Sequence, residues 1–158
     1  MSIGFYAGSF DPFTVGHLNI VKKASEIFDH VIIGIGHNSA KSGRYDKSDM
    51  LSAIKSTLKD NNINNCECII YNGLTVSEAK KRGATYLIRG IRNGMDYATE
   101  ENLAEINEEI SGIDTIYLRA GRYGAVSSSM VCELLNNGID VSKYLPKAVY
   151  ELVQKNKL

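Results

Sequence analysis

Short apolar runs alternate regularly with segments of helical periodicity along this chain, and this alternation constrains the fold more than any other feature. Five runs, at residues 3–7, 31–35, 66–71, 86–88 and 115–118, have the length and composition of buried strands. Strands that alternate with helices predict a mostly parallel sheet covered on both faces. We therefore expect an α/β fold, in which a doubly wound five-stranded sheet is followed by a helical C-terminus.

Apolar residues spaced three or four apart mark the helices between these strands. They are Ile20, Val21, Ala24, Ile27 and Phe28 in the first helix, Met50, Leu51, Ile54 and Leu58 in the second, and Leu103, Ile106 and Ile110 in a later one. A short helix over 76–82 is predicted to end at Gly83, and two further helices follow the last strand. The sequence contains no linker, repeat or low-complexity segment, so we expect one Rossmann-like domain over residues 1–158.

Charge and hydropathy limit the partners of the chain. Eighteen lysine and arginine side chains balance 18 aspartate and glutamate side chains, which argues against bulk attraction to nucleic acid or to an anionic membrane. No apolar run approaches the ~20 residues that span a bilayer, and the first residues lack the pattern of a secretion signal. We expect Cys66, Cys68 and Cys132 to be reduced thiols of a cytoplasmic protein.

Polar segments follow the predicted strands, at residues 8–17, 37–44, 73–75, 89–92 and 119–129. The carboxyl ends of parallel strands meet at one edge of a sheet, and the ligands of such sheets bind there. We therefore expect these segments to form one site.

Several of these segments carry groups that suit anions. His17 stands at the start of a predicted helix, whose free N–H groups attract phosphate. Arg89 and Arg92 offer paired donors after the fourth strand, and Lys41 and the serines 127–129 stand in neighbouring loops. Taken singly, each group has an ordinary explanation. The histidine could simply begin a helix, the arginines could be surface charges, the lysine could be solvated, and a serine could cap a helix. Together they predict a ligand with several phosphates and no metal site built from protein side chains.

Other phosphate-binding and catalytic patterns are missing from the sequence. There is no G-x-x-x-x-G-K-[ST] loop, and the stretch Gly34-Ile35-Gly36 does not continue into a dinucleotide fingerprint. No G-x-S-x-G nucleophile motif occurs. The three histidines, His17, His30 and His37, include no pair with the spacing of metal ligands.

The loop after the first predicted strand, GSFDPFTVGH at residues 8–17, resembles the G-[ST]-F-D-P-x-[HT]-x-G-H signature of the nucleotidyltransferase superfamily. The TxGH form of this motif, together with LIRGIRNGMDY at 87–97 and VSSSMV at 126–131, resembles the bacterial phosphopantetheine adenylyltransferases in particular. The likeness extends from the first strand to DVSKYLP at 140–146.

The resemblance implies an enzyme that transfers the adenylyl group of ATP to 4′-phosphopantetheine and releases dephospho-coenzyme A and pyrophosphate. Mg²⁺ would accompany ATP, and the chain would assemble as a homohexamer under feedback by coenzyme A. The acceptor phosphate would attack the α-phosphorus of ATP directly, without a covalent intermediate. Catalysis would then depend on positioning and on charge stabilisation.

The resemblance also assigns roles to residues. His17 would be the catalytic residue that stabilises the α-phosphate, and no protein side chain would ligate a metal. The acceptor would contact Ser9, Lys41, Thr75 and Arg89. ATP would contact Ser9, Phe10, His17, Gly90, Ile91, Arg92, Glu100, Tyr123, Gly124, Ala125, Val126, Ser127, Ser128 and Ser129. Taken alone, Glu100 fits an acid on a helix surface better than a carboxylate that orients a ligand.

Departures from the usual family pattern bear mainly on acceptor binding. Ser9 stands where threonine is commoner, and the loop 41–45 lacks the usual Lys-Lys-Pro-aromatic order. Thr75 replaces an apolar residue beside the pantetheine arm, and residues 97–99 differ from the usual Phe-Glu-Tyr. We therefore expect these differences to affect the acceptor pocket more than the nucleotide site.

Two other hypotheses remain open. A related transferase would use another phosphorylated acceptor, such as nicotinamide mononucleotide or glycerol 3-phosphate, although such relatives more often have histidine at the position of Thr14. A non-catalytic sensor would bind a nucleotide without reaction. It would not need transition-state donors such as His17, Arg89 and Arg92.

Overall fold

The computed structural model describes residues 1–38, 40 and 42–156 of the chain. Its centre is a five-stranded, wholly parallel sheet with the strand order β3-β2-β1-β4-β5. The strands are β1 (Ile3–Gly8), β2 (His30–His37), β3 (Cys66–Asn72), β4 (Tyr86–Ile91) and β5 (Asp114–Arg119). The predicted doubly wound α/β fold is confirmed.

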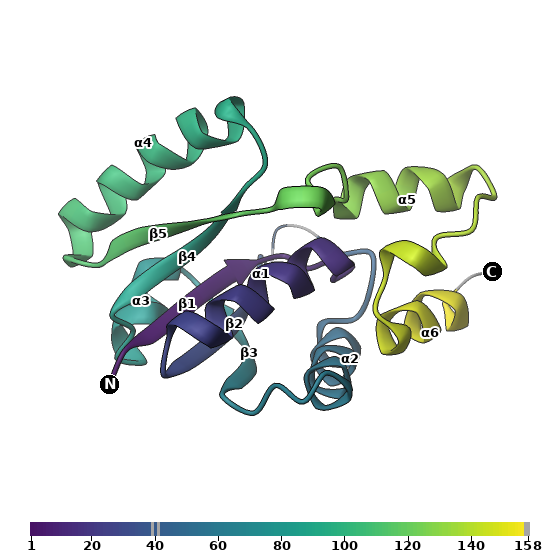
Figure 1. Cartoon of the computed structure of the whole chain (residues 1–158), viewed down its shortest axis with the longest axis horizontal. Helices are drawn as coiled ribbons and strands as arrows, with labels where there is room; N and C mark the ends of the chain where they lie inside the picture. The colour runs from purple at the N-terminus through teal and green to yellow at the C-terminus, as the bar shows by residue number, and fades with distance from the viewer. Residues whose placement is uncertain (39, 41, 157–158) are drawn as a thin grey trace.

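Helices connect the strands and cover both faces of the sheet (Figure 1). They are α1 (Val15–Ile27), α2 (Lys47–Asp60), α3 (Thr75–Lys81), α4 (Gly94–Ser111), α5 (Ser128–Asn136) and α6 (Lys147–Lys155), with 3₁₀ turns at Gly121–Tyr123 and Ser142–Tyr144. Helices α1, α2, α5 and α6 contribute to the core on one face, and α3 packs on the other. None of the helices in the described part of the chain has the length and hydropathy needed to cross a membrane.

Two apolar clusters, one on each face, hold the sheet between its helices. Parallel register aligns Phe5 with Ile32 and Leu87 on the face that α3 covers. The next residues along the strands point to the opposite face, because side chains alternate along a strand. There Tyr6 and Ile33 join the cluster that α1, α2, α5 and α6 complete.

The fourth strand is longer than the sequence predicts. The apolar run predicts a strand over 86–88, but β4 continues to Ile91. The cause is backbone pairing with β5, which extends through Arg89, Gly90 and Ile91. Arg89 therefore projects from the strand itself, and Arg92 is the first residue beyond the strand.

The end of the first helix also differs from the expectation. Ile27 shares the spacing of the core residues, but it is 54% exposed. It is the last residue of α1, and the extended cap residue Phe28 fills the core instead. Helical spacing alone therefore extends the buried face of α1 one residue too far.

The strand order determines where a ligand can bind. From β1 the chain moves outward to β2 and β3, and it then crosses back to β4 on the other side of β1. In doubly wound sheets a crevice opens at the carboxyl ends of the strands where this direction reverses. The segments that follow β1 and β4 therefore border the same crevice.

Candidate active site

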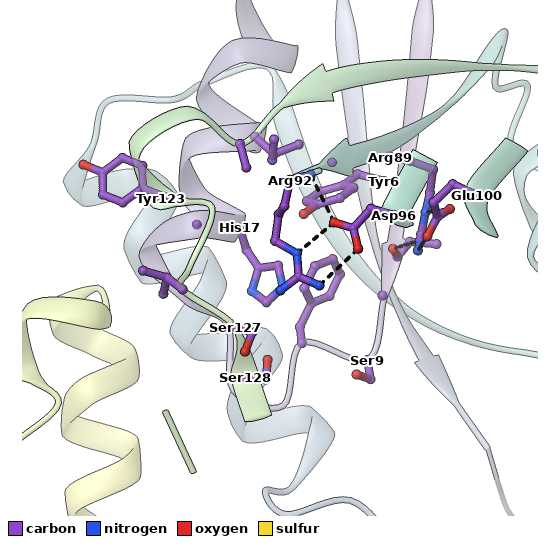
Figure 2. A pocket seen from close by; sticks show the side chains of 18 residues that line it. Tyr6, Ser9, His17, Arg89, Arg92, Asp96, Glu100, Tyr123, Ser127 and Ser128 are labelled. Carbon is purple, nitrogen blue, oxygen red and sulfur yellow. Dashed lines mark hydrogen bonds and ion pairs between the residues drawn. The ribbon is translucent and has the colours of Figure 1, made fainter. Parts of the chain in front are cut away.

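A cleft of about 320 Å³ lies at the carboxyl ends of β1 and β4. Its walls come from the β1–α1 loop, the end of β4, the first turn of α4 and the segment that leads into α5 (Figure 2). This volume is typical of small-molecule sites. The first turns of α1, α4 and α5 all border the cleft, so three helix N-termini place partial positive charge around it.

Aromatic packing holds the loop between β1 and α1. The ring of Phe10 contacts those of Tyr6, Phe13 and His17 at centroid distances of 5.2, 5.5 and 5.0 Å. Phe10 has a φ of 46°, in the left-handed region that residues other than glycine rarely adopt. Glycine at position 8 lets the Phe10 ring pack closely, because a Cβ there would lie only 3.0 Å from that ring. Packing thus fixes the loop in one shape at the base of the cleft.

Thr14 and His17 form reciprocal hydrogen bonds at the start of α1. The side chain of Thr14, the N-cap, accepts from the His17 backbone N–H at 3.3 Å. In return, His17 Nδ1 accepts from the Thr14 backbone N–H at 2.9 Å. An accepting Nδ1 leaves the ring proton of a neutral imidazole on Nε2. His17 can therefore offer an N–H donor to the cleft that it lines.

The surroundings of His17 keep its ring neutral. Burial lowers the pKa of His17 from 6.5 to about 4, and the positive charges of Arg89 and Arg92 act in the same direction. The imidazole is therefore uncharged at pH 7. It can donate a hydrogen bond from Nε2 to a phosphate oxygen without first binding a proton.

Arg89 is held on two sides. Its Nε and Nη2 donate to the two carboxylate oxygens of Glu100 at 2.7 and 2.8 Å, and its Nη1 donates to the Ala7 carbonyl at 2.9 Å. Burial disfavours the charged guanidinium, but the hydrogen bonds and charge of Glu100 outweigh it and raise the pKa of Arg89. Glu100 therefore orients an arginine of the cleft and is not a free acid on a helix surface.

Arg92 is paired in a similar way with an acid that the sequence reasoning missed. Its Nε and Nη2 donate to the carboxylate of Asp96 at 2.9 and 3.3 Å (Figure 2). These hydrogen bonds raise the pKa of Arg92 and lower the pKa of the Asp96 carboxyl. The available sequence signal was the spacing of four residues between opposite charges, which favours a pair along a helix.

The wall at the start of α5 is tied to the β1–α1 loop. Ser128 Oγ donates to the Pro12 carbonyl at 2.7 Å, and Ser127 caps α5 by accepting a backbone N–H at 3.1 Å. Gly16 permits the close approach of the two segments, because a Cβ there would lie 3.2 Å from the Val126 carbonyl. One serine of the triplet is thus a helix cap, and another is a bridge between two walls.

The end of the loop with the atypical sequence, at Arg44 and Tyr45, is anchored to the same motif. The carboxylate of Asp11 accepts from the backbone N–H groups of Arg44 and Tyr45 at 2.7 and 3.0 Å. Arg44 Nη1 also donates to the Asp11 carbonyl at 2.9 Å. Lys41, predicted to contact the acceptor, lies outside the described residues.

Most of the predicted site residues meet in the cleft. Those that line it are Ser9, Phe10, His17, Arg89, Gly90, Arg92, Glu100, Tyr123, Val126, Ser127 and Ser128. Ile91, Gly124, Ala125 and Ser129 do not line it, and of these Ala125 and Ser129 face solvent. The cleft also has walls that sequence reasoning did not name, such as Tyr6, Ile20 and Ala120. Their apolar character gave no chemical signal in the sequence.

A smaller cavity of about 90 Å³ adjoins the cleft and shares Ala7, Arg89 and Glu100 with it. Thr75, predicted to contact the acceptor, lines this second cavity among mainly apolar side chains. The hydroxyl of Thr75 shares a hydrogen bond of 2.8 Å with the hydroxyl of Tyr71. The Thr75 hydroxyl, at a position where the family usually has an apolar residue, therefore has its hydrogen-bond partner within the protein.

Within residues 1–38, 40 and 42–156, no three histidine, cysteine, aspartate or glutamate side chains are grouped so that they could hold a metal ion. The cleft carboxylates Asp96 and Glu100 are each engaged by an arginine. A divalent cation would therefore take its ligands mainly from the phosphates of a bound nucleotide and from water.

Comparisons with known proteins agree with this geometry. The cytidylyltransferase-like family model matches residues 5–134, a range that contains every residue lining the cleft. The fold and the site are thus those of a nucleotidyltransferase. A bifunctional NMN adenylyltransferase/ADP ribose pyrophosphatase from Francisella tularensis shares the fold, with a TM-score of 0.75 at 17% identity over 98% of this chain and 49% of that one.

Relatives in sequence narrow the class. The phosphopantetheine adenylyltransferase of Leuconostoc mesenteroides subsp. mesenteroides is 40% identical over 157 residues, which cover 98% of this chain and 96% of the relative. That of Porphyromonas gingivalis is 42% identical over 147 residues, which cover 92% and 95%. This chain belongs to the phosphopantetheine adenylyltransferase family.

The neutral form of His17 can be tested by NMR of protein labelled with ¹⁵N-histidine. At pH 7 we expect Nε2 to be protonated and Nδ1 to be unprotonated, and the ring should titrate with a midpoint near pH 4. Arg92→Gln should raise the midpoint, because it removes a positive charge that disfavours the imidazolium. A wild-type midpoint near 6.5, or a protonated Nδ1 at pH 7, would contradict this assignment.

Proposed function

We propose that this chain transfers the adenylyl group of ATP to the phosphate of 4′-phosphopantetheine, giving dephospho-coenzyme A and pyrophosphate. The observation that carries the proposal is the meeting of two cavities at Arg89, which lines both. An acceptor phosphate at Arg89 would lie at the edge of the nucleotide cleft. The rest of the acceptor, a flexible arm of methylene and amide groups, would extend into the mainly apolar cavity.

The chemistry needs no protein nucleophile. A phosphate monoester is already ionised at neutral pH, so its oxygen can attack the α-phosphorus without a strong general base. The protein must hold the two phosphates in line and stabilise the charge that develops between them. His17, Arg89, Arg92 and the surrounding helix N-termini supply donors for that task.

We propose the following roles for the residues around the two cavities and for Lys41. Ser9, Arg89 and the undescribed Lys41 would hold the acceptor phosphate, and Thr75 would contact the pantetheine arm. His17 would donate from Nε2 to an oxygen of the α-phosphate. The rest of the ATP would lie against the remaining predicted residues that line the cleft, including Arg92, Glu100, Tyr123, Val126, Ser127 and Ser128.

We further propose that Mg²⁺ enters with ATP. When bound, the ion would offset negative charge on the phosphates, as it does in other reactions of nucleotides. We place this reaction in the cytoplasm, and the free thiols of Cys66, Cys68 and Cys132 are consistent with that compartment.

An apolar stripe on α4 supports the proposal of self-association as a homohexamer. Leu103, Ile106 and Ile110 recur along one side of this helix and are 55%, 52% and 59% exposed in the single chain. Contiguous exposed apolar side chains often mark an interface between proteins. Contact with other copies of the chain would remove this stripe from water.

A coupled assay tests the proposed reaction. Purified protein given ATP, Mg²⁺ and 4′-phosphopantetheine should release one pyrophosphate for each dephospho-coenzyme A formed. Nicotinamide mononucleotide with ATP, or glycerol 3-phosphate with CTP, should give no release. Turnover with either of these and none with 4′-phosphopantetheine would refute the proposal, and ATP binding without any turnover would favour a sensor.

The same assay tests the role of His17. His17→Ala should reduce kcat by about 10²–10³-fold, because a donor to the developing charge is lost. The Kd of ATP, measured by calorimetry, should change far less. The control His30→Ala alters a histidine at the amino end of β2, away from the cleft, and should keep kcat. Weaker ATP binding with an unchanged kcat would show that His17 contributes to binding of ATP and not to the transition state.

Sedimentation velocity tests the proposed assembly. Ile110→Asp should shift the protein from a hexamer to smaller species, because it places a charge in the apolar stripe. Ile27→Asp introduces the same charge at an isoleucine of similar exposure on α1, and it should leave the assembly intact. An unchanged sedimentation coefficient for Ile110→Asp would contradict the role of the stripe.

A further inference from the structure

Asp96 is an acid in a cleft that is otherwise suited to phosphates, and its charge alone would oppose phosphate binding. It is the third residue of α4, and it lines the cleft beside Arg92 (Figure 2). Direct binding of a phosphate therefore cannot be the role of this carboxylate. Its contacts point to a different role.

Three hydrogen bonds connect the Asp96 carboxylate to Arg92. Oδ2 accepts from the Arg92 backbone N–H at 3.1 Å and from Nε at 2.9 Å, while Oδ1 accepts from Nη2 at 3.3 Å. The backbone N–H of Asp96 donates to the side chain of Asn93, the N-cap of α4, at 2.9 Å. One carboxylate thus holds both the main chain and the guanidinium of Arg92.

This pairing leaves Arg92 able to bind a phosphate. A guanidinium has five N–H donors, and the Asp96 carboxylate engages only two of them. The Arg92 side chain is 43% exposed, so a ligand can reach the remaining donors. Among the described residues, Asp96 is the one hydrogen-bond partner of this guanidinium. Without it, a long side chain would sample many rotamers.

We propose that Asp96 is a positioning residue, which orients the Arg92 guanidinium toward the phosphate chain of the nucleotide. This inference rests on the adenylyl transfer proposed above. Asp96 stays paired while the free N–H groups of Arg92 meet the charge that develops during transfer. A donor displaced by a small distance loses much of its effect on the rate.

Helix capping alone is the competing explanation, and α2 offers a matched control. Asp49 is the third residue of α2, and its backbone N–H donates to the N-cap Asp46 at 3.0 Å. Its side chain does not line the cleft. Asp49→Asn therefore neutralises an acid at the same helical position without altering the site.

Kinetics of the single and double variants test the inference. Asp96→Asn should lower kcat by about 10–100-fold, because the bidentate pair is lost. The Kd of ATP should stay within about threefold of wild type, because removing a negative charge offsets the looser arginine. In an Arg92→Gln background, Asp96→Asn should cause no further loss of kcat, since the group that it positions is absent. Asp49→Asn should leave kcat unchanged.

Three kinetic results would overturn the positioning role. They are a wild-type kcat in Asp96→Asn, equal losses of kcat and ATP affinity in that variant, and additive losses in the double variant. Thermal unfolding of each variant should show that it is folded at the assay temperature. Asp96→Asn is preferred to Asp96→Ala for this purpose, because asparagine can still accept the backbone N–H of Arg92.

An NMR readout separates this inference from the proposed reaction. In the ATP-bound protein, the ¹⁵N–¹H signal of Arg92 Nε should be protected from exchange in wild type and lost in Asp96→Asn. Failure of wild type to turn over any acceptor would refute the adenylyl-transfer proposal. Persistence of the Arg92 signal in Asp96→Asn would overturn the positioning role, whichever acceptor the enzyme uses.

Discussion

Parallel pairing of β1 with β2 on one side and β4 on the other is the constraint on which the site depends. It brings the loop after β1 to the same edge of the sheet as the arginines at the end of β4. The hydrogen bond from Arg89 to the Ala7 carbonyl joins residues 82 positions apart in the sequence. The core on both faces therefore supports the site indirectly, because it holds these two strands in register.

The electrostatics of the cleft combine attraction with restraint. Helix N-termini and two arginines provide positive potential, while Asp96 and Glu100 limit the freedom of each guanidinium. The same arginines help to keep His17 uncharged. The cleft thus contains the neutral donor His17 near two oriented cations, Arg89 and Arg92. This arrangement suits phosphoryl transfer, in which negative charge is redistributed among phosphate oxygens while the total charge stays the same.

Much of this arrangement could be predicted from the sequence, because parallel strands place the segments after them at one edge. The features of the site that the sequence did not predict depend on contacts between segments that are distant in the sequence or on where a helix begins. Arg89 belongs to β4 because the backbone of β4 pairs with β5 there. The residues Arg89 and Gly90 are not typical of a strand, so the sequence did not predict this extension. Asp96 was missed because its pairing depends on where α4 begins. The hydroxyl of Thr75 is paired by Tyr71, whose position comes from β3.

The hydrogen bond from Ser128 to the Pro12 carbonyl has a consequence for the synthesis of the chain. It spans 116 residues and joins two walls of the cleft. A nascent chain that has emerged only as far as the start of α4 has the first wall and both arginines, but it lacks the wall at α5. Nucleotide bound in the complete cleft can therefore stabilise the fold only after the residues at the start of α5 have emerged.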